Sequence, residues 1–281
     1  MVAVPSRAKT FGVSILYFLV FFFFQVITSV IFGGIAVVGH QYSQQQADAA
    51  INLAVSSNAY IITIISVFLS LAVYALILYS KKQDIEELLG FNKLATVPII
   101  RATLLGLSLS AIFSFILSVS SAIKIFPEYK YLIQTISTSN TILPLITAIL
   151  VAPVFEELLF RGLILNELRN RFSLISAVLI QSLLFGLYQG NLLQLLFSFI
   201  AGIVFSFVYV WTKSLLPGIA MHIGFRVIGF LLALGHSYIN WIVYTFILLG
   251  GLALAASMLS NIYQDRIQED PLEITDEAYP S

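Results

Sequence analysis

Residues 143–161 read LPLITAILVAPVFEELLFR, an apolar segment that is long enough to cross a membrane and carries three ionisable side chains toward its end. These side chains are Glu156, Glu157 and Arg161. A charged group near the middle of a spanning helix costs about 3 kcal/mol on insertion scales. Three such groups in one segment therefore indicate a buried polar site rather than a plain membrane anchor.

The composition of the whole chain is that of a polytopic membrane protein. Its 281 residues are 59% hydrophobic and 10% charged, and the mean hydropathy is +0.97, which is far from the average soluble domain. The 14 basic and 14 acidic residues cancel, so bulk charge argues against a nucleic-acid partner. The chain has no cysteine, which excludes disulfides, cysteine nucleophiles and cysteine ligands.

Apolar runs of about 20 residues predict an all-α polytopic membrane protein with about eight transmembrane helices. We expect a division into an N-terminal transmembrane hairpin with a cytoplasmic loop (1–94), a core (95–260) and an acidic cytoplasmic tail (261–281). The expected spans are residues 11–38, 59–80, 97–122, 141–165, 173–189, 192–212, 217–235 and 239–259.

Basic residues predict the orientation, because cytoplasmic loops of membrane proteins are enriched in lysine and arginine. Placing both termini in the cytoplasm leaves only Lys124 and Lys130 in outer segments. The inner segments then hold Arg7, Lys9, Lys81, Lys82, Lys93, Arg169, Arg171, Lys213 and Arg266. We therefore expect a multi-pass plasma-membrane protein with both termini cytoplasmic.

The spacing of the charged residues suggests a division of roles. Glu157 and Arg161 are four residues apart, so they share a helix face and are expected to form a structural ion pair. Glu156 is rotated by about 100° from Glu157 and is free to face a cavity and act on water as a general base. His222 and Arg226 also lie four residues apart on one face, although a lone histidine can equally serve only in packing.

These residues carry a resemblance to the CPBP family of CAAX proteases and bacteriocin-processing enzymes, also called Abi proteins. That family has E-E-x-x-x-R, then F-x-x-x-H, then H-x-x-x-N or H-x-x-x-D on successive membrane helices. The first motif is intact from Glu156 to Arg161. The second has Phe185 but carries Gln189 in place of histidine, and the third has His222 followed by Arg226 in place of asparagine or aspartate.

The resemblance implies a CPBP-like bundle over residues 95–260, with a conical cavity lined by the fourth, fifth and seventh spans. It also implies that Glu156, Glu157 and His222 are the catalytic residues, with Gln189 and Arg226 at substituted positions. Glutamine cannot take up a proton near neutral pH and is a poor zinc ligand. No cofactor is therefore expected, but in an active enzyme Glu156 and His222 are the candidate zinc ligands.

Two functions follow from this reading. If Arg226 faces Glu156, it neutralises that carboxylate, which favours a catalytically impaired family member that acts as a membrane scaffold or regulator of an envelope partner protein. In the alternative, Arg226 stabilises an oxyanion and the protein is an active glutamate- or metal-dependent endopeptidase that processes membrane-associated peptides. The expected surroundings are the lipid bilayer of a bacterial plasma membrane and a membrane or cell-envelope protein.

Overall fold

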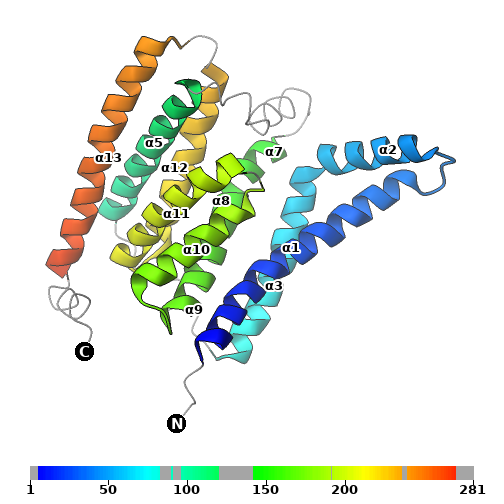
Figure 1. The fold of residues 1–281 in the computed structure, drawn as a ribbon, viewed down its shortest axis with the longest axis horizontal. Helices are drawn as coiled ribbons and strands as arrows, with labels where there is room; N and C mark the ends of the chain where they lie inside the picture. Colours follow the sequence, from blue (N-terminus) through cyan, green and yellow to red (C-terminus); the bar gives the residue numbers. More distant parts are fainter. Residues whose placement is uncertain are drawn as a thin grey trace.

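The computed structural model describes residues 6–82, 90, 96–119, 142–190, 192–235 and 239–269. All regular structure in these residues is helical (Figure 1). The predicted all-α polytopic fold is therefore confirmed. The acidic residues after Glu269, most of the predicted cytoplasmic loop and His236 lie outside the described residues.

Seven helices of the described part are long and apolar enough to cross a membrane. Six of them correspond to single helices, and the seventh, Leu143–Arg169, joins five consecutive segments. The six are α1 (Arg7–Val37), α3 (Ala59–Ser80), α5 (Thr96–Val119), α11 (Leu192–Thr212), α12 (Leu215–Gly235) and α13 (Trp241–Glu269).

Two elements differ from the expected spans. The segment predicted at 173–189 forms α10 (Leu174–Tyr188), whose 15 residues are fewer than the roughly 20 that a bilayer needs. The Ser173 side chain caps its start, and Gly190 follows its end at φ +82°. The stretch between the first two expected spans contains α2 (Gln44–Ser57), which begins with a capping box between Ser43 and Gln46.

In Figure 1, α13 lies at one edge of the bundle beside α5 and α12, and α1, α2 and α3 lie at the other edge. α5 packs against both α12 and α13, α10 packs against α11, and α1 packs against α2 and α3. The first turn of α1 and the last turn of α13 lie at the same end of the molecule. Gly106 permits the close contact of α5 with α12, because a Cβ atom there would lie 1.9 Å from the Met221 carbonyl oxygen.

The helix that carries the paired glutamates contains two π-helical segments. It runs through α7 (Leu143–Ile146), η2 (Thr147–Val151), α8 (Ala152–Glu157), η3 (Leu158–Leu165) and α9 (Asn166–Arg169), where η2 and η3 are π-helical. π-helical turns are rare and occur frequently at functional sites. Here they flank the six-residue segment that ends with Glu156 and Glu157.

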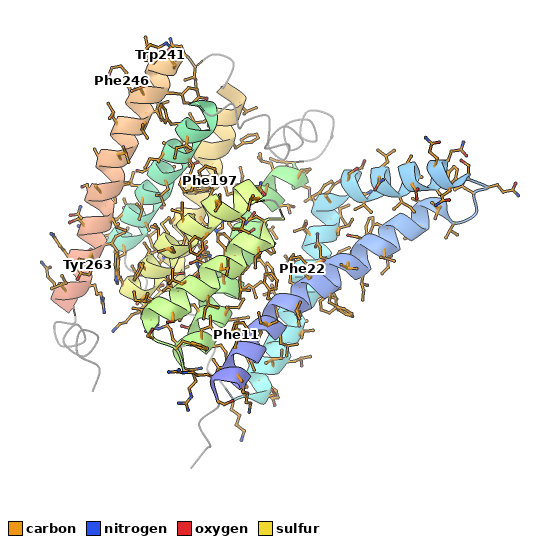
Figure 2. The ribbon with its side chains drawn as sticks, in the orientation of Figure 1. Phe11, Phe22, Phe197, Trp241, Phe246 and Tyr263 are labelled. Atoms are coloured by element: carbon orange, nitrogen blue, oxygen red, sulfur yellow. The ribbon has the colours of Figure 1, made fainter. Side chains whose placement is uncertain are left out.

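Apolar side chains cover the outer faces of the bundle as well as its interior. Trp241 and Phe246 project outward from α13 (Figure 2) and are 74% and 70% exposed. Such exposure is expected where the surrounding solvent is lipid. Inside, the buried side chains form two apolar clusters, one centred on η3, α10 and α1 and one on α5, α11 and α12.

Candidate functional site

Five ionisable side chains meet where the two apolar clusters join. α8 supplies Glu156 and Glu157, η3 supplies Arg161, and α12 supplies His222 and Arg226. They form a continuous series of contacts in the order Arg161, Glu157, His222, Glu156, Arg226. Buried charges are tolerated when they are paired in this way, so the series explains how two carboxylates can occupy an apolar helix.

Arg161, Glu157 and His222, which we call the inner trio, are sealed from the surroundings. Arg161 and Glu157 are 0% exposed and His222 is 2% exposed. Glu157 Oε1 accepts a hydrogen bond of 3.0 Å from Arg161 Nη1 and lies 2.9 Å from His222 Nδ1. These are ordinary hydrogen-bond lengths, so Glu157 connects the two helices through one oxygen.

Aromatic rings and a backbone carbonyl hold the inner trio from the other sides. The Arg161 guanidinium lies 4.6 Å from the Phe185 ring centroid and 5.2 Å from that of Phe205, as in cation–π contacts. Its Nη2 donates to the Gly202 carbonyl oxygen at 3.3 Å. The same two rings contact His222 edge-on. Phe185, the intact part of the second motif, therefore packs on both residues.

Gly218 provides the space that Glu157 occupies. A Cβ atom at Gly218 would lie 3.1 Å from Glu157 Oε2, which is closer than comfortable packing allows. Glu157 Oε2 is buried and accepts no hydrogen bond from the described residues. The carboxylate is therefore bonded on one oxygen and enclosed on the other.

Glu156 and Arg226 form a looser contact. Arg226 Nη2 lies 3.3 Å from Glu156 Oε2 and 3.4 Å from Oε1, at the long end of the hydrogen-bond range. Glu156 is 2% exposed, whereas the Arg226 side chain is 29% exposed. The sequence suggested that Glu156 is free to face a cavity. In the structure its carboxylate faces Arg226 and His222.

His222 lies between the two glutamates. Its Nδ1 is 2.9 Å from Glu157 and its Nε2 is 3.4 Å from Glu156 Oε2. A neutral imidazole donates from one nitrogen only, and the shorter contact is the better hydrogen bond. The Glu157 contact therefore orients the ring, and Nε2 is the nitrogen that faces Glu156.

Gln189 does not join this series of contacts. It is the C-cap residue of α10, half-buried, and its side chain makes no hydrogen bond among the described residues. The residue before it, Tyr188, is electrostatically close to both Glu156 and Arg226. The motif comparison drew attention to Gln189 and missed Tyr188, although Tyr188 shares a helix face with Phe185 three residues earlier.

A second polar group lies on the other side of Arg161 and was also missed. The Ser206 hydroxyl is within hydrogen-bond reach of the Gln181 side-chain oxygen and of the Gly202 carbonyl oxygen. Gln181, Ser182 and Ser206 are 0% exposed. The only signal in the sequence is the presence of polar residues in otherwise apolar helices, which gives no partner.

These side chains do not fit a zinc ion. Catalytic zinc takes three protein ligands, but only Glu156 and the Nε2 of His222 converge here, and Glu156 is already in contact with the Arg226 cation. Within the described ranges no three histidine, cysteine or acidic side chains are arranged as a metal site. A permanent positive charge beside the two donors opposes a divalent cation.

The part of the chain that carries these residues is similar to a known protein family. Residues 138–228 match the family model described as Type II CAAX prenyl endopeptidase Rce1-like. The chain carries an Rce1-like domain. The match spans both helices of the five-residue series, and the predicted resemblance to the CPBP family is confirmed over these residues.

Two relatives are similar to part of the chain. One, named "Uncharacterized 24.3 kDa protein" of Escherichia coli, is 34% identical over 123 residues, which are 42% of this chain and 56% of that protein. The other, named "Putative membrane peptidase YdiL" of Bacillus subtilis (strain 168), is 33% identical over 81 residues, 29% of this chain and 33% of that protein. The chain therefore spans about half or less of each relative. No solved structure matches the chain.

Proposed function

We propose that this multi-pass membrane protein has an impaired peptidase site and acts as a scaffold or regulator that binds a membrane or cell-envelope protein. The observation that carries the proposal is the position of Glu156. Its carboxylate is 2% exposed and lies between Arg226 Nη2 and His222 Nε2. A general base must reach a water molecule, and here the lone pairs of the carboxylate face a guanidinium and an imidazole.

The substituted second motif supports the same conclusion. A glutamine cannot exchange a proton near neutral pH, so Gln189 cannot replace a histidine that activates water. The two carboxylates and two arginines also sum to zero formal charge. A self-neutralised series is stable without substrate or metal, because every buried charge already has a partner.

The second candidate function is an active endopeptidase that processes membrane-associated peptides or proteins. It is favoured by the partial exposure of the Arg226 side chain, which is 29%. A guanidinium that reaches open space beside Glu156 is able to stabilise an oxyanion. In this case Glu156 releases Arg226 when substrate binds and then activates water.

Peptidase assays on the full chain in proteoliposomes separate the two candidates. We expect no cleavage of a quenched-fluorescence peptide library by the wild type, and cleavage by the Gln189→His, Arg226→Asn double variant. The matched control is Gln45→His with Arg7→Asn, two exposed positions away from the site. Wild-type cleavage that Glu156→Ala abolishes would overturn the proposal and establish the second candidate.

The binding role has its own test. A photo-crosslinking residue at exposed positions of the chain in native membranes should capture one protein reproducibly, and reciprocal purification should return this chain. The same protein should be captured by the Glu156→Gln variant, because binding does not depend on hydrolysis. Loss of the cellular phenotype in Glu156→Gln with the captured protein still bound would contradict a scaffold role.

The proposed orientation has both termini in the cytoplasm of a bacterial plasma membrane. The natural absence of cysteine permits single-cysteine variants without other changes. Ser6 precedes α1, and Ser43 precedes α2 near the opposite end of α1. In intact cells a membrane-impermeant maleimide should label Ser43→Cys and not Ser6→Cys; the reverse pattern would invert the proposed topology.

A further inference from the structure

Tyr188 lies in an aromatic group that joins the Rce1-like domain to the N-terminal helix. Its ring centroid is 5.6 Å from Phe160 of η3, 5.5 Å from Phe21 and 6.1 Å from Phe22 of α1. Figure 2 shows Phe22 on the side of α1 that faces the other helices. These separations are those of interacting aromatic pairs, so α1 fixes the position of the Tyr188 ring.

The position of Tyr188 on α10 directs it toward the ion-pair series. Tyr188 follows Phe185 by three residues and therefore shares its helix face. Phe185 packs on Arg161 and on His222. Tyr188 lies one turn beyond Phe185 on α10, and Arg226 lies one turn beyond His222 on α12. Both side chains are therefore expected on the same side of the inner trio.

The place of Tyr188 one turn beyond Phe185 on α10 puts its phenol on the side of the looser contact. Glu156 and Arg226 both act on it electrostatically, with opposite signs. Among the residues that the structure describes, the Tyr188 hydroxyl has no hydrogen-bond partner, and the side chain is half-buried. A tyrosine hydroxyl in a largely apolar setting usually finds a partner, and the Glu156 carboxylate is the acceptor whose charge acts on this phenol.

We propose that Tyr188 is a positioning residue of this site, with its phenol facing the Glu156–Arg226 pair and its ring held there by Phe21 and Phe22 of α1. The inference rests on the proposed function in one respect, because it takes the Glu156–Arg226 pair as the part of the site that contacts a ligand. It adds a hydrogen-bond donor beside Glu156. It also makes α1, which lies outside the matched residues 138–228, one wall of the site.

Fluorine NMR of the full chain labelled with 3-fluorotyrosine in nanodiscs tests the first half of the proposal. The resonance of Tyr188 among the 13 tyrosines is assigned by its loss in Tyr188→Phe. We expect Glu156→Gln and Arg226→Gln each to shift this resonance by more than its linewidth, while the resonance of Tyr74 stays in place and reports an intact fold. An unchanged Tyr188 resonance in both variants would overturn the proposal.

Two phenylalanines on α1 give a matched pair for the second half. Phe22 contacts Tyr188, whereas its neighbour Phe23 is 59% exposed. Phe22→Ala should shift or broaden the Tyr188 resonance, and Phe23→Ala should leave it unchanged. If both variants leave it unchanged, α1 does not position Tyr188. Neither outcome depends on peptidase activity. A failure of this inference can therefore be distinguished from a failure of the proposed function.

Discussion

The inner trio and the Glu156–Arg226 pair lie side by side but differ in how firmly they are held. Arg161 and Glu157 are fully buried, with a 3.0 Å contact and two aromatic rings near the guanidinium. Glu156 and Arg226 are 3.3–3.4 Å apart, and Arg226 is partly exposed. Adjacent glutamates of one motif therefore have different surroundings. The first contact is suited to hold helices together, and the second is able to rearrange.

The largest expected difference is between Glu157→Gln and Glu156→Gln. Neutralising Glu157 strands the Arg161 charge at 0% exposure and should lower the free energy of unfolding by about 3 kcal/mol. Neutralising Glu156 leaves Arg226 with access to its surroundings and should cost under about 1 kcal/mol. Chemical unfolding in detergent micelles measures both. Equal losses in the two variants would remove the distinction between the trio and the pair.

Some of this arrangement could be predicted from the sequence and some could not. The spacing of Glu157 and Arg161 is enough to place both on one helix face, and apolar length is enough to predict the spans. The contact of His222 with both glutamates depends on how far α12 slides along α8. That register is set by close packing, as at Gly106 against Met221, which no local pattern encodes.

Two further features show why local rules were insufficient. α10 is preceded by the capping residue Ser173 and followed by Gly190. Both signals are present in the sequence, but the apolar run between them was interpreted as a span. Tyr188 was missed because an aromatic residue in an apolar helix normally serves in packing. It is distinguished by its neighbours in space, Phe21 and Phe22, which come 167 and 166 residues earlier in the chain, and by the charges beyond it.

A methyl group at Gly218 should disturb the inner trio without changing its charge. Its Cβ would lie 3.1 Å from Glu157 Oε2, and the carboxylate cannot withdraw easily because its other oxygen is bonded to Arg161 and His222. We expect Gly218→Ala to lose about 1–2 kcal/mol of unfolding free energy. Gly250→Ala is the control, because nothing lies within 4 Å of the added carbon. A stabilised Gly218→Ala would mean that Glu157 is not tightly enclosed.

Ser206→Ala tests whether the firm region extends beyond Arg161. The hydroxyl bonds Gly202 and reaches Gln181, so its removal leaves a buried glutamine with fewer partners. The expected loss is about 1 kcal/mol, measured by the same unfolding titration. Ser257→Ala on the exposed face of α13 should be neutral. If Ser206→Ala is also neutral, the inner trio ends at Arg161.

The smallest expected effect is at Lys81, where an ion pair lies near the end of α3 rather than within the bundle. Lys81 Nζ lies 2.9 Å from Glu167 Oε2, with the two side chains 32% and 11% exposed. Desolvation lowers the pKa of Lys81, but the hydrogen bond to Glu167 and the neighbouring Tyr17 outweigh it and raise the pKa above 10.5. Lys81→Met should cost only about 0.5 kcal/mol near neutral pH.

The pH dependence of that loss gives the sharper measurement. Because the pKa of Lys81 is higher in the folded than in the unfolded protein, its contribution is complete below the unfolded value. It disappears as the pH rises through the folded value. The difference in melting temperature between wild type and Lys81→Met should therefore be constant from about pH 7 to about pH 9.5 and shrink as the pH rises further. Lys82→Met, at an exposed neighbouring position, should match the wild type throughout. A difference that instead grew with pH would mean that Lys81 is destabilised by its desolvation and that Glu167 does not compensate for it.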